Sequence, residues 1–388
     1  MQNIVINPNS GAELVISEYI APPPAPNPYW NRPASWLTMP TITGSEDLIA
    51  ILFPVDNTSY NTITIPAITA NFIVDWGDGV VENFSSGTSP THSYVFANIP
   101  QSSQTPLGYR QALVKITPQA GNSLTSMANL SGSSCLDVVA SGPNLIMVGI
   151  GGCNRMEHMK LLCRVSGVLG VNYGVVLIEL SQNVFSTKTD LANIFNSNWN
   201  MVYVDYFDTG SNTNFSNIFR DCRSLKTLPN INFNNVTNTL NVFHGCNALT
   251  KIPAIQFTNV VNVSSTFISN CANLEEINIT GQVSGMDQIF TACFKLTTFP
   301  AIDMSQCGVL NSQLAPSALK RFLGYGMRNS FRLDQRSLGR TELVEVFTNL
   351  GVANAGATLN IRLCPGTDSL TNNDKLIATN KGWTLITT

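Results

Sequence analysis

The sequence FRDCRSLKTLPNI (residues 219–231) returns as FHGCNALTKIPAI (243–255) and again as FTACFKLTTFPAI (290–302). Phenylalanines at 195, 219, 243, 267 and 290 are separated by 24, 24, 24 and 23 residues. The shared pattern is Phe-x-x-Cys-x-x-Leu-x-x-Leu-Pro-x-Ile, and the copy that starts at Phe267 carries one extra residue before its cysteine. A pattern that recurs every roughly 20 to 50 residues indicates a repeat protein.

The repeat predicts a solenoid, because one coil of this length cannot bury its apolar face alone and must stack on its neighbours. A helical interpretation of the three-residue spacing conflicts with the prolines and with Asn-rich bends such as 234–238, which stop a helix after at most about two turns. We therefore expect short strands joined by short helical or 3₁₀ turns. Two weaker upstream copies bring the count to about seven coils: Ile150, Cys153, Met156, Met159, and then Val171, Gly174, Leu177, Leu180.

The order Phe, Cys, Leu, followed by a strand and an Asn-Val-Thr-Asn turn (235–238), resembles the BspA-like leucine-rich repeats of bacterial surface proteins and phage structural proteins. The resemblance covers residues 150–307, and its Cys position is occupied by Asn198 upstream. It implies a leucine-rich-repeat solenoid over 120–307. Such solenoids present extended surfaces that suit the recognition of glycans or proteins.

Residues 44–119 predict a small all-β sandwich. Phe72, Val74 and Trp76 point to one face of a strand because they recur every second residue, and Gly77-Asp78-Gly79 suits a tight hairpin that needs positive φ angles. The expected strands are Leu48–Phe53, Thr62–Ile68, Asn71–Trp76, Val80–Phe84, Ser93–Phe96 and Gln111–Ile116.

Three spaced elements of this region resemble a polycystic-kidney-disease (PKD) type β-sandwich: Trp76-Gly77-Asp78-Gly79, His92-Ser93-Tyr94, and Gly108-Tyr109 ahead of the last strand. The resemblance implies a spacer or binding module that is not a catalyst. Asp75, Asp78 and His92 could suggest a metal site. We assign none, because Asp-Gly serves the turn and a lone His beside a Tyr usually makes hydrogen bonds within such a sandwich.

The two ends differ from the middle of the chain. Residues 1–43 are expected to be an N-terminal attachment arm, with a weak strand or hairpin at 3–19 and a polyproline II spacer at 21–28, for which an SH3-type ligand is the alternative. Residues 308–388 are expected to cap the solenoid with a helix at 341–350 that Gly351 stops, a strand at 357–363, a helix at 371–379 and a closing strand at 382–386. The ending from Ile377 to Thr384 resembles that of repeat proteins encoded by phages and prophages.

The composition limits the classes of function that the protein can have. Only 12% of the 388 residues are charged, against a usual share of about 25%, while 43 are asparagine, so the polar surface is mostly neutral. A net charge of −3 with scattered Lys and Arg disfavours nucleic-acid binding. The first residues lack the pattern of a secretory signal, and no run of about 18 apolar residues predicts membrane insertion.

The residues offer no catalytic constellation. The nine cysteines are an odd number without a Cys-x-x-Cys pair, and we expect them to fill the core, with disulfides between stacked coils as the alternative. His244 and Cys246 lie too close in one coil to form a dyad, and Glu275 and Glu276 are adjacent, whereas a glycan hydrolase needs two carboxylates that face each other across a cleft. No catalytic, cofactor-binding or metal-binding residue is assigned.

These observations predict a mainly β protein with short helices: a PKD-like sandwich, a leucine-rich-repeat solenoid and an α/β cap. The expected function is that of a non-enzymatic structural protein on the surface of a phage virion, assembled in the host cytoplasm, as a tail fibre, baseplate appendage or capsid decoration. Expected partners are other virion proteins, through the arm, and a host-surface glycan or protein receptor; homo-oligomerisation is left open. The alternative is a bacterial cell-surface adhesin.

Overall fold

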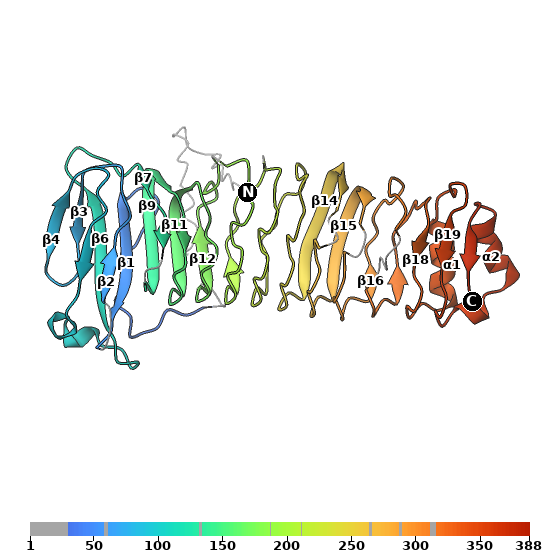
Figure 1. Ribbon diagram of the computed structural model, residues 1–388, viewed down its shortest axis with the longest axis horizontal. Coiled ribbons are helices and arrows are strands. Elements are labelled where there is room, and N and C mark those ends of the chain that lie inside the picture. Colours follow the sequence, from blue (N-terminus) through green and yellow to red (C-terminus); the bar gives the residue numbers. More distant parts are fainter. Residues whose placement is uncertain are drawn as a thin grey trace, which may run out of the picture.

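The fold is that of a computed structural model, which describes residues 30–57, 61–131, 134–186, 188–210, 212–263, 266–286, 289–310 and 316–388. The strand expected at 3–19 and the proline-rich stretch 21–28 lie outside the described residues. The protein is elongated, and its strands run across the long axis (Figure 1). It is mainly β, with few short helices and a β-solenoid-like stretch, which confirms the expected fold class at this level.

A β-sandwich forms the N-terminal end. Its larger layer has the antiparallel order β9-β1-β6-β3-β4, and the smaller layer pairs β2 with β5. The strands are β1 (Leu48–Val55), β2 (Thr62–Thr64), β3 (Phe72–Asp75), β4 (Val81–Phe84), β5 (Thr91–Ser93), β6 (Arg110–Pro118) and β9 (Asp137–Met147), with 3₁₀ turns at Phe96–Asn98 and Gln101–Ser103. Phe72, Val74 and Trp76 are fully buried, as their alternation predicts, and Gly77 and Gly79 have φ angles of 79° and 98°.

The sandwich sheet continues without a break into the solenoid. Strand β9 pairs antiparallel with β1 on one side and parallel with β11 on the other, and β12 and β13 follow in parallel. The solenoid therefore begins on a paired strand, and the sandwich covers the end of its core. The additional strands here are β7 (Ser126–Met127), β8 (Leu130–Ser131), β10 (Ile150–Gly151), β11 (His158–Val165), β12 (Leu177–Leu180) and β13 (Tyr203–Val204).

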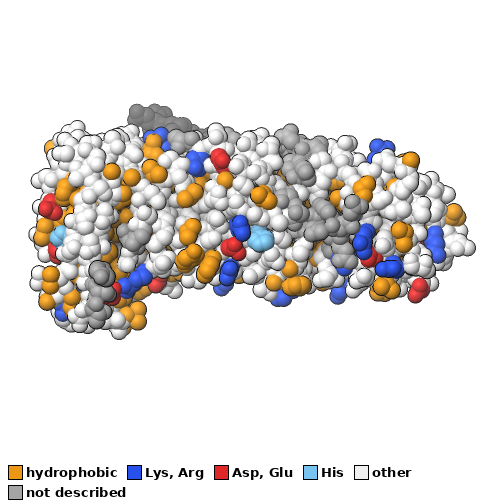
Figure 2. Space-filling model, in the orientation of Figure 1, with side chains coloured by type: hydrophobic (Ala, Val, Ile, Leu, Met, Phe, Trp, Pro, Cys, Tyr) orange, Lys and Arg blue, Asp and Glu red, His pale blue; other side chains and the backbone are white. Residues whose placement is uncertain are grey.

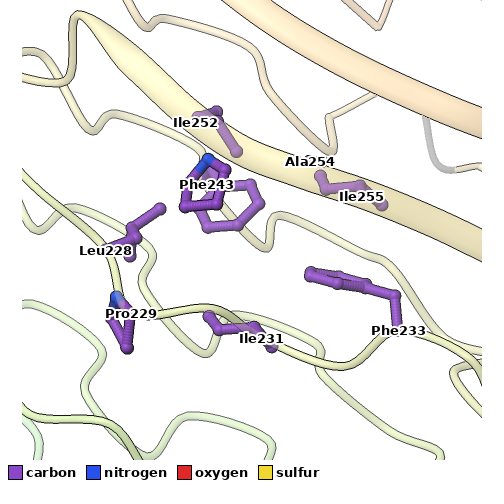
Figure 3. Close-up of a pocket in the computed structure, with 9 residues that line it drawn as sticks. Leu228, Pro229, Ile231, Phe233, Phe243, Ile252, Ala254 and Ile255 are labelled. Atoms are coloured by element: carbon purple, nitrogen blue, oxygen red, sulfur yellow. The ribbon is translucent and has the colours of Figure 1, made fainter.

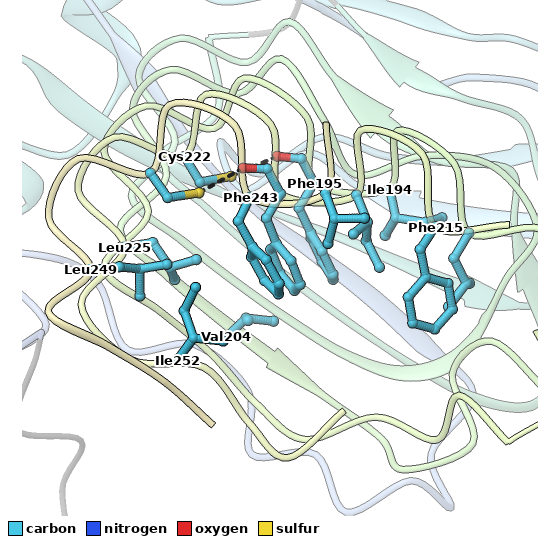
Figure 4. Packing of buried hydrophobic residues seen from close by; sticks show 14 of the residues in the cluster. Ile194, Phe195, Val204, Phe215, Cys222, Leu225, Phe243, Leu249 and Ile252 are labelled. Atoms are coloured by element: carbon cyan, nitrogen blue, oxygen red, sulfur yellow. Dashed lines mark hydrogen bonds between the residues drawn. The ribbon is translucent and has the colours of Figure 1, made fainter. Parts of the chain in front are cut away.

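Equivalent residues of successive coils stack in columns inside the solenoid. The Phe219 ring lies nearly parallel to Phe195 and Phe243, with centroids 5.3 and 5.9 Å apart (Figure 4). Each repeat cysteine then links coils: the Cys222 thiol donates to the Phe195 carbonyl over 3.1 Å, and Cys246 does the same to Phe219. Four strands lie in the later coils: β14 (Lys251–Asn262), β15 (Glu276–Gly285), β16 (Thr298–Phe299) and β17 (Arg321–Phe322).

The described residues of 150–307 contain no helix, and the expected 3₁₀ element is present only as single turns. In these turns an amide donates to the carbonyl three residues earlier, as Cys222 does to Phe219 and Leu225 to Cys222. Other amides of the same segments donate to the next coil, as Phe195 does to Ile218 and Phe219 to Val242. Positive φ angles recur at Asn193, Asn217 and Asn241. Because asparagine tolerates the left-handed region better than most residues, part of the asparagine enrichment serves the backbone.

The register expected for the second upstream copy is also wrong. Val171 is 43% exposed and has a φ angle of 62°, so it cannot be a core position. Leu169, Asn172 and Val175 take the core positions instead, and all three are buried. The first upstream copy and the expected Leu177 and Leu180 are buried as predicted. Between Ile150 and Phe195 the two coils are 19 and 26 residues long, whereas the coils after Phe195 have 23 or 24 residues. The register therefore shifts at this point.

The last coils carry the two helices of the chain's described part. The elements of this region follow the expected order. They are β18 (Phe331–Arg332), α1 (Arg340–Asn349), β19 (Thr358–Asn360), a 3₁₀ turn at Thr367–Ser369, α2 (Asn372–Thr379) and β20 (Thr384–Ile386). Gly351 is not in a left-handed conformation, so it does not stop α1 in the expected way. A Cβ atom there would lie 2.6 Å from the Gly326 carbonyl oxygen, and the glycine permits this close approach.

Residues 30–43 lie on the outer face of the shared sheet. The Trp36 indole donates to the Tyr109 hydroxyl over 3.0 Å, and the buried Gln111 amide bonds the backbone of Ser35 and Leu37. Arg32 forms an ion pair with the fully buried Asp137, and Trp30 stacks on His158 at 4.9 Å. This part of the expected arm is therefore packed against β1, β6 and β9.

His158 makes this junction sensitive to pH. Burial lowers its pKa, but hydrogen bonds and charge from Asp137 and Glu179 outweigh burial and raise the pKa from 6.5 to about 9. The stabilisation is therefore complete below pH 6.5 and is lost as the pH rises through 9. We expect the free energy of unfolding, measured by urea denaturation, to fall by on the order of 2–3 kcal/mol between pH 6 and pH 9.5. The variant His158→Gln should not show this fall. If the free energy of unfolding fell equally with pH in both proteins, the pH sensitivity would not come from His158.

Candidate functional site

The residue that follows each core Cys or Asn lies on one outer edge of the solenoid. We call these residues the edge row: Tyr173, Trp199, Arg223, Asn247, Ala272 and Phe294. The side chains of Asn172, Asn198 and the repeat cysteines are buried, so the next residue in each coil points outward. The residue type in the edge row differs from coil to coil.

The first half of the edge row is a stacked ladder. The Tyr173 and Trp199 rings are 4.4 Å apart, and the Arg223 guanidinium lies 4.5 Å from the Trp199 ring centroid. Tyr173 belongs to the preceding coil and Arg223 to the following one, so Trp199 contacts both neighbouring coils. A cation–π contact such as that of Arg223 stabilises by about 0.5–2 kcal/mol. The ladder joins three coils and orients Arg223, while Trp199 remains 39% exposed.

The second half of the edge row is hollow. Ala272 is the small member of the row here, and Gly245 and Ala292, which precede the cysteines of the coils on either side, are small as well. The space between Arg223 and Phe294 has a volume of about 370 Å³. The remaining lining residues are Asp221, His244, Asn247 and Asn270. Phe294 is 62% exposed and forms the far wall. This volume is typical of small-molecule sites, which are about 300–1,000 Å³. We call this space the edge hollow.

The polar groups of the edge hollow are held by neighbours in adjacent coils. His244 Nδ1 lies 2.7 Å from the Ser269 hydroxyl, and its Nε2 lies 3.4 Å from the Asn270 amide. The Asp221 carboxylate is 3.4 Å from Arg220 and 3.9 Å from Arg223. The edge hollow therefore combines donors and acceptors, and its lining carries one cation, Arg223, and one anion, Asp221. The visible face of the molecule is mostly neutral, and a mixed group of basic, acidic and histidine side chains lies midway along it (Figure 2).

A second depression is apolar and much smaller. It lies between the loop 228–233 and β14 and is lined by Leu228, Pro229, Ile231, Ile252 and Ile255, among others (Figure 3). Pro229 and Pro253 have no N–H group, so neither can donate a ladder hydrogen bond there. The space holds about one water molecule and is a packing gap between coils.

The residues considered for metal binding in the sandwich make structural contacts. His92 Nε2 lies 2.7 Å from the Asp78 carboxylate, and its ring stacks on Trp76 with centroids 4.7 Å apart. The Tyr94 hydroxyl donates to the Trp76 carbonyl over 2.8 Å. Asp75 accepts from the Gly77 amide within the turn. These bonds fix the hairpin and the sandwich core. Within the described ranges, no three His, Cys, Asp or Glu side chains form a group that could hold a metal ion.

The structure separates the other candidate groups. Cys246 is fully buried with its thiol on the Phe219 carbonyl, and burial raises its pKa, whereas His244 faces the edge hollow. Glu275 and Glu276 are exposed and face Lys295 and Lys251 at 3.8 and 2.6 Å. Among the described residues, no helix is long and apolar enough to cross a membrane.

All nine cysteines are buried, and none of them forms a disulfide in the structure. Burial raises the pKa of Cys163 and Cys307 to about 12, which suppresses the reactive thiolate. We expect Ellman titration without reductant to count about nine thiols in denaturant and to proceed slowly on the native protein. Two or fewer thiols in denaturant would show that disulfides join the coils instead.

The chain was compared with protein-family models, with curated proteins and with solved structures, and no match was found in any of the three. The edge hollow therefore has to be interpreted from its own chemistry. The sequence pattern contained a signal for it, since the position after the repeat cysteine changes from Arg223 and Asn247 to Ala272 and Phe294. The size of one residue per coil does not show, before the coils are stacked, that a depression forms there.

Proposed function

We propose that the protein is a non-enzymatic structural protein on the surface of a phage virion, which presents its solenoid for adhesion to the host surface. In this proposal the N-terminal unit is a PKD-like module and the coils are BspA-like leucine-rich repeats. The observation that carries the adhesive role is the edge hollow: a mixed polar and aromatic depression that stands on a rigid, elongated, mostly neutral scaffold. Sites built on regular, well-packed elements hold their geometry better than sites on loops.

The buried cysteines and the charge pairing of Glu275 and Glu276 support a role without catalysis. The neutral Asn, Ser and Thr surface is typical of proteins outside the cell. Turnover of a host polysaccharide by the purified protein would overturn the non-enzymatic assignment.

Immunogold electron microscopy, with mass spectrometry of purified particles, tests the location. Labelling of a tail tip or fibre is the result expected for host recognition, and labelling over the head would assign a decoration or head-fibre role. Absence from particles together with labelling of intact cells would replace the virion proposal with the bacterial adhesin.

Deletion of the N-terminal segment tests how the protein attaches to the particle. Because residues 30–43 pack on β1, β6 and β9, the informative deletion is 1–29, which leaves the Trp36 and Arg32 contacts intact. We expect loss of the protein from particles with an unchanged thermal midpoint. Normal incorporation of this truncated chain would exclude attachment through the first 29 residues.

A further inference from the structure

We infer that the edge hollow binds one neutral sugar residue of a glycan chain, an inference that rests on the proposed adhesive function and specifies its ligand. The argument uses the shape of the floor, the chemistry of the walls and the local charge.

The floor is made flat by three small residues in consecutive coils. Gly245, Ala272 and Ala292 stand where a larger side chain would fill the space. At Gly245 the φ angle is 77°, and an added Cβ atom would lie 2.7 Å from the Asp221 carboxylate. A larger residue there would be strained and would press on the wall. The floor therefore keeps its shape for a reason other than chance packing of surface side chains.

The walls call for a ligand that both donates and accepts hydrogen bonds. Asp221 only accepts and Arg223 only donates, while the amides of Asn247 and Asn270 do both. A hydroxyl group is one donor with two acceptor lone pairs, so a ring that carries several hydroxyls can satisfy all four side chains. The exposed Phe294 ring adds an apolar surface on which the C–H groups of such a ring can pack.

The charge of the edge hollow favours a neutral ligand. The Asp221 carboxylate lies between Arg220 and Arg223 at 3.4 and 3.9 Å, and the Arg223 guanidinium also stacks on Trp199. Arg223 is thus already engaged by a carboxylate and an aromatic ring. Of these three charged groups only Asp221 and Arg223 line the edge hollow. A uronic acid or phosphosugar would have to compete with Asp221 for Arg223 and would also meet the repulsion of the Asp221 carboxylate.

The solenoid gives the ligand a direction. Phe294 and Arg223 stand three coils apart on one edge, so a glycan that occupies the edge hollow can continue along the coil edges.

Saturation-transfer NMR and calorimetry on the full-length protein test the inference. The probes are neutral oligosaccharides derived from dextran, mannan and galactan, and acidic ones derived from alginate and polygalacturonate. We expect at least one neutral set to bind and both acidic sets to fail. Binding of acidic probes alone, or of no neutral probe, would overturn the inference.

Variants locate the binding. Ala272→Trp fills the edge hollow at a position where the row already carries Trp199 and Phe294, so the fold accommodates it; the dissociation constant should rise at least tenfold. Phe294→Ala should raise it about fivefold. The matched control is Tyr325→Ala, which removes a 44% exposed aromatic from another coil and should change nothing. Unchanged binding by Ala272→Trp would overturn the inference.

Asp221→Asn tests the charge argument separately. Asp221 has a φ angle of 57°, which asparagine tolerates, so the backbone is preserved. This variant should keep neutral binding within about threefold and begin to bind the acidic probes. Continued exclusion of acidic probes would contradict the role of Asp221. If the protein is found on particles but binds no neutral glycan, this inference alone is refuted. If it binds a neutral glycan but is absent from particles, only the virion location is refuted.

Discussion

Phe219→Ala is expected to lower the free energy of unfolding by about 3–5 kcal/mol, the usual range for loss of a buried phenylalanine. Phe219 is completely buried, and its ring stacks between Phe195 and Phe243. The substitution removes both stacking contacts and leaves a cavity in the middle of a continuous core, where neither flanking coil can collapse without breaking its own backbone ladder. Urea denaturation followed by circular dichroism measures the change.

Phe294→Ala is the matched control, because it removes the same side chain from the surface of a nearby coil. It should change the free energy of unfolding by no more than about 0.5 kcal/mol. Phe219→Leu should lower the free energy of unfolding less than Phe219→Ala does, since Leu169 occupies the equivalent position in an upstream coil. If the Phe219 and Phe294 alanine variants were equally stable, the stacked column would not be a major source of stability.

The spacing of the phenylalanines predicted the solenoid because a core column needs an apolar residue at the same place in every coil. That requirement is strict for Phe219 and Phe243, whose neighbours on both sides are other phenylalanines. It is looser upstream, where Leu169 fills the column and coil length varies. Sequence spacing alone then assigned Val171 to the core, although the fold exposes it.

Asn172 and Asn198 show why a polar residue at a core position was hard to interpret from sequence. Both are fully buried, yet each satisfies its amide: Asn198 donates to the Leu169 carbonyl over 2.8 Å, and its side-chain oxygen accepts from the Asn172 backbone. Asn172 does the same for Cys153. These residues replace the inter-coil thiol bond of Cys222 with two bonds. Only the stacking of coils reveals the partners.

The edge hollow could not have been predicted from spacing, because its walls come from four different coils. Arg223 and Phe294 are 71 residues apart in the sequence, and nothing in either coil indicates that the residues between them on the edge are small enough to leave a depression. The sequence specified the core of this protein more strongly than its surface, since burial constrains residue size and polarity and exposure does not.

Gly281→Ala is expected to destabilise the protein by about 2–5 kcal/mol, the second large effect. Gly281 lies in β15 with a φ angle of 102°, and an added Cβ atom would lie 2.1 Å from the Phe257 carbonyl oxygen in the paired strand β14. Two terms add: a left-handed conformation costs a non-glycine residue about 1–2 kcal/mol, and overpacking against backbone costs about 1–3 kcal/mol. Thermal and urea denaturation measure the sum.

Gly356→Ala separates the two terms of this prediction. Gly356 has a φ angle of 77°, but an added Cβ atom would meet nothing within 4 Å, so only the conformational term of about 1–2 kcal/mol applies. The difference between the two variants therefore reports the close approach of β14 and β15. If both variants lost the same stability, backbone conformation alone would explain Gly281. A larger loss at Gly281 would show that the distance between neighbouring coils leaves no space for even one methyl group where Phe257 and Gly281 pair.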